Sequence, residues 1–203
     1  DMGGPFDLIA DRFLPEHYER MVQGMADAVE AAYDDLRPAS VGHVLASADA
    51  HDDRRCEDGL DYTNDSLPVL AVERDGQIDA LIMSYAIHGT VLDITDFTLS
   101  GDVSGAIEDR VEADFDHPVT ALLLQSWGAD VSPSGPAEAD TQVGADLPEG
   151  YDTMERAAVT VSDAVHAALA DLQTTTEPEL RAEVHRVPLG RDAIGYTDDE
   201  FPH

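Results

Sequence analysis

The alternation of apolar and polar residues divides the chain into helical and extended segments. From Leu14 to Pro38 apolar side chains recur at helical spacing, with Pro15 suited to the first turn and Pro38 to the stop, so a helix is predicted there. A short helix is predicted at about 102–113 and a longer amphipathic one at 151–172. The apolar side of the first helix is expected to pack in the core rather than to hold a cofactor. That side consists of Tyr18, Met21, Val22, Met25, Val29, Ala32, Tyr33 and Leu36.

Extended segments lie between these helices. The valine-rich stretch 40–48 predicts a strand. The Asp-Gly pair at 75–76 is favoured in tight turns and predicts a hairpin, whose second strand, about 78–87, is apolar enough to be central. A second buried strand is predicted within 117–127. The other segments are interpreted as a polar loop at 49–66, a loop at 132–150 and a last strand at 179–190.

Helices and strands intermix along the chain, so the predicted fold class is α/β, with a mixed β-sheet flanked by amphipathic helices. The 203 residues are enough for one domain or a large part of one, and 1–203 is treated as a single unit. The chain opens with Asp1 and not with methionine, so we expect it to be a fragment of a longer protein.

The charge balance narrows the classes of partner and environment. There are 43 acidic residues against 11 arginines and no lysine, for a net charge of −32 spread along the whole chain. Such a surface is typical of proteins from very salty environments, so we expect a halophilic source and a soluble protein, either cytoplasmic or secreted. It disfavours nucleic-acid binding. No segment is apolar enough to span a membrane and no signal peptide is visible. The single Cys56 excludes an internal disulfide and is interpreted as a tolerated free thiol.

His88 is the first candidate for chemistry. It follows an apolar strand and precedes a glycine, a position where open-sheet proteins gather ligands. Neutral imidazole is the commonest metal ligand in proteins. The alternative is a hydrogen-bonded histidine at a strand end with no role in chemistry.

Ser132 is the second candidate, at the end of the other apolar strand. If the two strands are neighbours, both side chains open onto one edge of the sheet. The alternative is a plain turn, in which Asp130 accepts backbone N–H bonds and Pro133 fixes the geometry. There is no Gly-x-Ser-x-Gly or His-Glu-x-x-His motif. A third candidate, Asp102, is either a helix N-cap or part of a site.

In their order along the chain these pieces resemble the neutral/alkaline non-lysosomal ceramidase family. The resemblance rests on "YAIHGTVL", "LSGDVSGAIE" and "ALLLQSWGADVSP", and more weakly on the loop "DDRRCEDGLDYTNDSLPVLAVERDGQ". It is specific over 81–133 and loose elsewhere up to about 190. It implies part of the N-terminal catalytic domain of a zinc-dependent amidohydrolase, which cleaves the amide of ceramide or of another N-acyl lipid or amide.

The resemblance also implies roles for individual residues. His88 matches a zinc-binding histidine, and Ser132 matches a serine that acts as nucleophile or orients substrate and water. Asp130 stands beside Ser132 as a catalytic candidate, more suited to holding the turn than to acting as a base. Arg54, a weaker match to an Asn-Arg loop, and Gln125 are candidates for binding substrate.

Three departures from the family pattern keep a second function open. The upstream Thr-His-Thr-His-Ser-Gly-Pro segment is missing, and the glutamate and tyrosine ligands of the family belong beyond His203. In the turn, Ala129 separates Gly128 from Asp130, and Ser134 replaces the usual asparagine. A catalytic zinc needs about three protein ligands, so we expect one Zn²⁺ with most of its ligands outside this chain. The alternative is a non-catalytic, ceramidase-like binding or structural protein with a degenerate site. The oligomeric state stays open.

Overall fold

A β-hairpin forms the centre of the fold. The structure is a computed structural model that describes residues 14–54, 63–92, 99–134 and 150–186. Strands β3 (Ser66–Arg74) and β4 (Gln77–Tyr85) pair antiparallel across a two-residue turn, in which φ is 53° at Asp75 and 78° at Gly76. Glycine adopts this left-handed backbone without strain and aspartate tolerates it. The predicted hairpin is thus confirmed.

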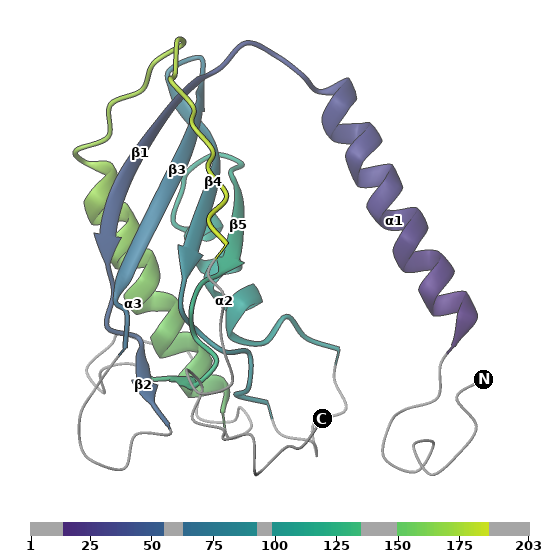
Figure 1. Ribbon diagram of the computed structural model, residues 1–203, viewed down its shortest axis with the longest axis vertical. Coiled ribbons are helices and arrows are strands. Elements are labelled where there is room, and N and C mark those ends of the chain that lie inside the picture. Colours follow the sequence, from purple (N-terminus) through teal and green to yellow (C-terminus); the bar gives the residue numbers. More distant parts are fainter. Residues whose placement is uncertain (1–13, 55–62, 93–98, 135–149, 187–203) are drawn as a thin grey trace.

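Two further strands complete a mixed sheet. Strand β1 (Ser40–Ser47) runs antiparallel to β3, and β5 (Thr120–Gln125) runs parallel to β4, giving the order β1-β3-β4-β5 (Figure 1). A parallel pair needs a crossover connection, and helix α2 (Asp102–Ala113) lies within it. The α/β class, the mixed sheet and the helix at 102–113 are confirmed.

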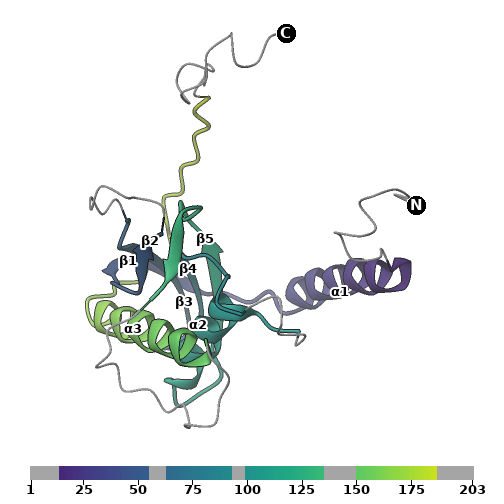
Figure 2. The same cartoon turned by 90° about the horizontal axis from the view of Figure 1, so that it is seen from below.

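One face of the sheet is covered by helices. Helix α2 and helix α3 (Tyr151–Leu169) lie on the same side (Figure 2). Alternate strand residues point to this side, so Val69 and Met83 meet Ile107 of α2 and Val161 of α3, all of them fully buried or nearly so. Each such side chain contributes about 1.5–3 kcal/mol relative to leaving it in water. The core therefore lies between the sheet and this helix pair.

Strand β5 is an edge strand and only partly buried. Ala121 is buried, but Leu122 on the opposite face is 47% exposed. The strand predicted here is therefore present, but the prediction that it is buried is wrong. On the free edge, the carboxylates of Glu112 and Glu108 in α2 accept the backbone N–H groups of Ala121 and Leu123, at 2.9 and 2.7 Å. These bonds occupy donors that an unpaired edge otherwise presents to other chains.

A small second sheet joins two loops. Strand β2 (His51–Asp53) pairs antiparallel with β6 (Val131–Pro133), so Asp52 lies opposite Ser132. The segments 49–66 and 132–150 were predicted to be loops, which is wrong for the three residues of β2 and for Ser132 and Pro133 of β6. Three residues are too short to show an alternating pattern in sequence.

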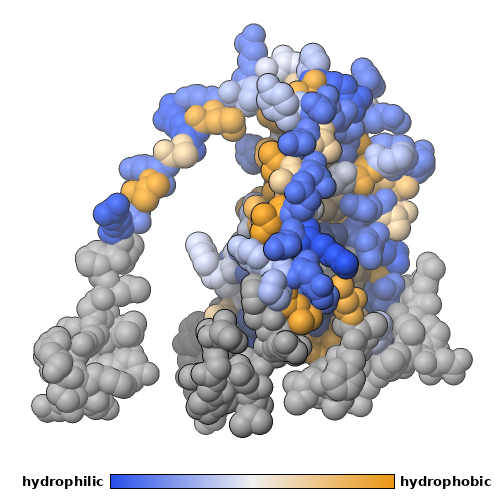
Figure 3. Space-filling view, turned by 90° about the vertical axis from the view of Figure 1, so that its right-hand side faces the viewer, coloured by the Kyte–Doolittle hydropathy of each residue, from blue (hydrophilic) through white to orange (hydrophobic). Residues whose placement is uncertain are grey.

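Helix α1 (Pro15–Asp34) forms as predicted, but its apolar side does not pack in the core. No side chain of this helix, which the structure describes in full, is buried, and Figure 3 shows its apolar residues at the surface. Met25 is 64% exposed and Tyr33 is 73% exposed. Helices α2 and α3 already cover the inner face of the sheet, and α1 does not pack on the outer face either, where Leu45 and Leu122 are 71% and 47% exposed. None of the helices in the described ranges is long and apolar enough to cross a lipid bilayer.

The predicted strand at 179–190 is not observed over its described part, 179–186. Leu180 and Val184 are 82% and 87% exposed, and no strand pairs with them in the described residues. Alternation alone does not make a strand without a partner edge. The chain instead touches β1 earlier, through a bridge between Val41 and Thr175. Cys56 and 135–149 lie outside the described residues.

Candidate functional site

The candidate site lies where the parallel strands β4 and β5 end side by side. Beyond β4, Ala86 and Ile87 are fully buried and His88 is half-buried. Beyond β5, the N–H of Ser126 donates to the carbonyl of Tyr85 at 3.0 Å, which extends the parallel ladder by one bond. The two strands are therefore neighbours, and their carboxyl ends open at one edge, where α/β folds place their ligands.

A hollow of about 400 Å³ lies at this edge. The described residues that line it include three of the candidates from the sequence, His88, Gln125 and Asp130. Trp127, 85% exposed, forms part of the wall. The remaining lining residues are Ser126, Gly128 and Ala129. The hollow thus combines an imidazole, an amide and a carboxylate beside an indole ring.

Gly128 allows the β5 turn to pack against the end of β4. A Cβ atom there would lie 3.0 Å from the backbone of Ala86 and Ile87 and 2.9 Å from Nε2 of Gln125. Contacts this short are tighter than most real Cβ contacts, so a side chain here would displace the Gln125 amide and shift the turn or the strand end by a few tenths of an ångström. The glycine is thus what lets the turn carrying Asp130 approach the strand that leads into His88.

Arg54 braces the same turn. The N–H of Val131 donates to the carbonyl of Gly128 at 3.3 Å, which closes the turn. The guanidinium of Arg54 donates to the carbonyl of Ala129 at 3.0 Å, and its backbone N–H donates to the carbonyl of Asp130 at 2.9 Å. Arg54, interpreted from the sequence as a substrate-binding residue, therefore fixes one wall of the hollow through two carbonyl groups.

Ser132 lies just behind the turn, in β6. It is half-buried, faces Asp52 across the β2–β6 ladder, and is not among the described residues lining the hollow. The next serine, Ser134, donates its backbone N–H to the carbonyl of Ala50 at 2.8 Å. The structure thus groups His88, Gln125 and Asp130 in one hollow, and places Ser132 two residues beyond Asp130.

A buried tyrosine, not singled out in the sequence, ties the small sheet to the large one. The hydroxyl of Tyr85 donates to the carbonyl of Ala48 at 2.8 Å and accepts the N–H of Ala50 at 3.1 Å, and Nδ1 of His51 lies 2.5 Å away. Burial raises the pKa of the Tyr85 phenol well above its usual range, so the hydroxyl stays protonated and keeps donating. In the sequence, the only indication of this role was that Tyr85 is a polar residue at the end of an apolar strand.

Asp102 is not the N-cap of α2, which was one of the two roles that the sequence left open for it. It is the first residue of α2, with φ at 50°, and the cap position falls on Gly101. Its carboxylate accepts the N–H of Val103 at 2.6 Å, and it also accepts N–H groups of Val91 and Leu92, in the segment that follows His88. The helix start is thereby joined to the loop leaving the candidate site.

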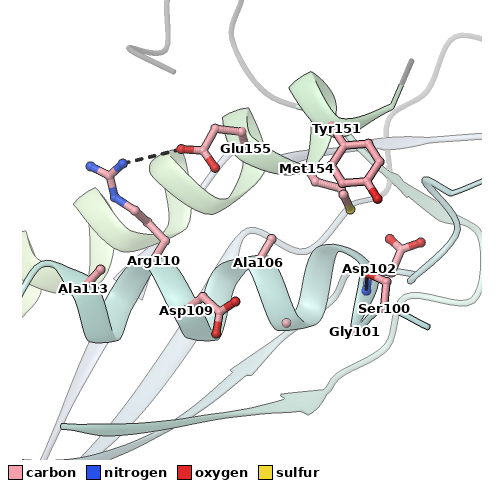
Figure 4. Close-up of a pocket in the computed structure, with 11 residues that line it drawn as sticks. Ser100, Gly101, Asp102, Ala106, Asp109, Arg110, Ala113, Tyr151, Met154 and Glu155 are labelled. Carbon is pink, nitrogen blue, oxygen red and sulfur yellow. Dashed lines mark hydrogen bonds and ion pairs between the residues drawn. The ribbon is translucent and has the colours of Figure 1, made fainter. Parts of the chain in front are cut away.

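A second hollow, of about 420 Å³, lies between α2 and α3 (Figure 4). Asp102 is at one end of it beside Tyr151, and an ion pair between Arg110 and Glu155, at 3.6 Å, lies further along (Figure 4). Much of its floor is formed by small residues of α2. Of the sequence candidates only Asp102 lies on it, so the hollow at the strand ends is the better candidate site.

The described residues do not form the complete zinc site that the resemblance implies. No group of three or more His, Cys, Asp or Glu side chains in the described ranges is arranged to hold a metal ion. The hollow offers the imidazole of His88 and the carboxylate of Asp130. A catalytic zinc typically has three protein ligands, so the residues described here do not by themselves fit the metal.

Comparisons with known proteins support the fold. No protein-family model matches the chain, and no curated protein matches its sequence. Among solved structures, neutral ceramidase from Pseudomonas aeruginosa aligns with a TM-score of 0.66 and 16% identity, over 78% of this chain and 27% of that one. A ceramidase complexed with C2 aligns with a TM-score of 0.64, also at 16% identity, over 78% and 26%.

At this level of identity the likeness establishes the fold. The chain has the α/β architecture of part of a ceramidase, and it spans about a quarter of the length of the ceramidase structures it matches. The fold component of the resemblance drawn from the sequence is confirmed.

Proposed function

We propose that this chain contributes part of the catalytic site of a ceramidase-like amidohydrolase, which cleaves the amide bond of ceramide or of another N-acyl lipid or amide. The observation that carries the proposal is the hollow at the carboxyl ends of β4 and β5, where His88, Gln125 and Asp130 meet on a ceramidase-like fold. Amide hydrolysis needs groups of these kinds, which move protons and hold a carbonyl.

Each candidate has a role in such a reaction. The amide of Gln125 is a donor for the substrate carbonyl, and the imidazole of His88 is a ligand of the metal that acts at the reacting centre. Ser132 acts as the nucleophile or orients substrate and water, while Asp130 and Arg54 hold the turn that carries it. Water adds to the carbonyl carbon, the C–N bond breaks, and the amine leaves with a proton.

A zinc ion belongs to the same proposal. His88 is the proposed ligand among the described residues, and the others come from outside them. A bound zinc would supply a polarised carbonyl and an activated water. Zinc content measured by elemental analysis in the wild type and in His88→Ala tests this, because loss of the imidazole is expected to lower the bound metal. Equal zinc in the two proteins would remove His88 from the ligand set.

The activity test uses His88 with a matched histidine elsewhere on the sheet. Amide hydrolysis of an N-acyl sphingoid base is measured in multimolar KCl on the protein at its natural full length. His88→Ala is expected to lose on the order of 100-fold or more in turnover, because the zinc loses a ligand. His43→Ala, on exposed β1 surface, is expected to keep the wild-type rate. If the wild type binds the amide without cleaving it, the chain is a non-catalytic relative; equal rates in the two variants would remove His88 from the reaction.

A further inference from the structure

Asp102 has a backbone conformation that its position in a helix does not explain. Among the described residues, only Asp75 and Asp102 are non-glycine residues with positive φ, 53° and 50°. Asp75 lies in the hairpin turn, where the left-handed conformation is required. Asp102 begins a helix, where the backbone is ordinarily right-handed. Left-handed conformations at such positions persist when surrounding contacts hold them.

The contacts of the Asp102 carboxylate lead back toward the candidate site. Its Oδ2 accepts the N–H of Leu92 at 3.0 Å and that of Val91 at 3.1 Å, and its Oδ1 accepts the N–H of Val103 at 2.6 Å. Two of the three donors thus belong to the loop after β4 and one to α2. Figure 4 shows Asp102 in the first turn of α2.

The clamped segment begins three residues after His88. The N–H of Thr90 donates to the carbonyl of His88 at 2.9 Å, which makes a tight turn directly after the imidazole. A Cβ at Gly89 would lie 3.7 Å from Cβ of Asp102, so the backbone of this turn passes close to the aspartate. On its other side, the strand end before His88 packs against Gly128. The backbone at His88 is therefore held from both directions.

We propose that Asp102 is a positioning residue, which clamps the backbone at 91–92 and thereby fixes the direction of the His88 imidazole in the hollow. The clamp itself rests on geometry alone, whereas its value for catalysis rests on the proposed amidohydrolase function. The left-handed backbone of Asp102 is the conformation in which its carboxylate reaches both segments.

The test replaces the carboxylate without straining the backbone. Asp102→Gly keeps the positive φ at no steric cost and removes all three bonds. Asp102→Asn keeps one acceptor oxygen and should fall between the glycine variant and the wild type. The matched control is Asp75→Gly, which removes an aspartate with nearly the same φ from the hairpin turn.

Two readouts do not depend on enzymatic activity. In Asp102→Gly, amide hydrogen exchange at Val91 and Leu92 is expected to accelerate on the order of tenfold or more, with that of the core strands unchanged. The NMR cross-peak of the His88 ring is expected to shift or broaden. Asp75→Gly should change neither. Unchanged exchange at Val91 and Leu92 would overturn the clamp, and an unchanged ring signal would overturn its link to His88.

A third readout applies if the wild type hydrolyses amides. Asp102→Gly should then lower kcat by roughly 10- to 100-fold with little change in KM, because substrate contacts are kept while the imidazole is misplaced. A wild-type kcat in this variant would overturn the positioning role. An inactive wild type would instead count against the proposed function, and the exchange and ring measurements would still decide the clamp.

Discussion

At the scale of single residues, the site depends on one position where no side chain fits. Gly128 lies against Ala86, Ile87 and the amide of Gln125, and this contact sets the distance between the turn and the end of β4. The absence of a side chain is what allows this contact, because the three nearest atoms belong to the backbone at the end of β4 and to the Gln125 amide.

Gly128→Ala is therefore expected to destabilise the protein by about 1–3 kcal/mol, since the new methyl group meets backbone atoms. The control is Gly24→Ala in α1, where nothing lies within 4 Å and a helical alanine should be neutral or stabilise by roughly 0.5–1 kcal/mol. Chemical denaturation measures both. A Gly128→Ala protein as stable as the wild type would contradict the close approach of turn and strand.

At the scale of elements, α2 and α3 are joined by a polar contact beside the core. Ser162 of α3 donates to Oδ2 of Asp114 at 2.7 Å, and Nε of Arg110 donates to the same oxygen at 3.0 Å. Burial acts to raise the pKa of Asp114, but these two bonds and the arginine charge outweigh it, and the pKa lies below its ordinary value.

The lowered pKa of Asp114 sets a pH window. Its contribution to stability is present above the unfolded pKa, 3.8, and is lost as pH falls through the lower folded pKa. We expect Asp114→Asn to be less stable than the wild type at pH 7, with the difference shrinking below about pH 4. Exposed Asp109 provides the control, Asp109→Asn. A difference in unfolding free energy that stays constant from pH 7 to pH 3 would argue against this account.

The outward position of α1 makes a second prediction at this scale. Met25→Gln, on the exposed apolar side, is expected to change the free energy of unfolding by less than about 0.5 kcal/mol. Met83→Ala, in the fully buried row of β4, should cost about 2–5 kcal/mol. Equal losses in the two variants would show that α1 packs against the body of the protein in solution.

The sequence predicted the positions of helices and strands better than it predicted which elements pack against each other. The turn at Asp75 and the helix from Asp102 to Ala113 follow from local signals that act within a few residues. Periodicity also predicts α1, but an apolar stripe does not specify its partner, and here α2 and α3, not α1, cover the inner face of the sheet. The clamp made by Asp102 joins residues ten and eleven apart, and short-range rules assign the same aspartate to capping instead.

The candidate site was predictable in part for the same reason. His88 and Gln125 follow apolar strands, so a parallel pairing of those strands brings them to one edge. The brace made by Arg54 on Ala129 spans 75 residues and has no signature in the chain. The three-residue β2 and the buried hydroxyl of Tyr85 likewise depend on contacts between distant segments.

At the scale of the whole molecule, charge is the dominant property. A net charge of −32 on 203 residues opposes the compact state by self-repulsion. Salt screens this repulsion, because the Debye length falls from about 10 Å at 0.1 M salt to about 3 Å at 1 M. The melting temperature is therefore expected to rise between 0.1 and 2 M KCl. Scanning calorimetry measures the rise, and a melting temperature that stays flat or falls would contradict the proposed adaptation to salt.

The most direct test of the central proposal is the release of fatty acid from ceramide in multimolar KCl, measured on the protein at its natural full length. The wild type is expected to turn over, Ser132→Ala to lose at least about 100-fold in kcat, and Ser134→Ala, which keeps its backbone bond to Ala50, to match the wild type. A wild type that releases no more fatty acid than buffer would contradict the amidohydrolase account, and an undiminished Ser132→Ala would remove that serine from it.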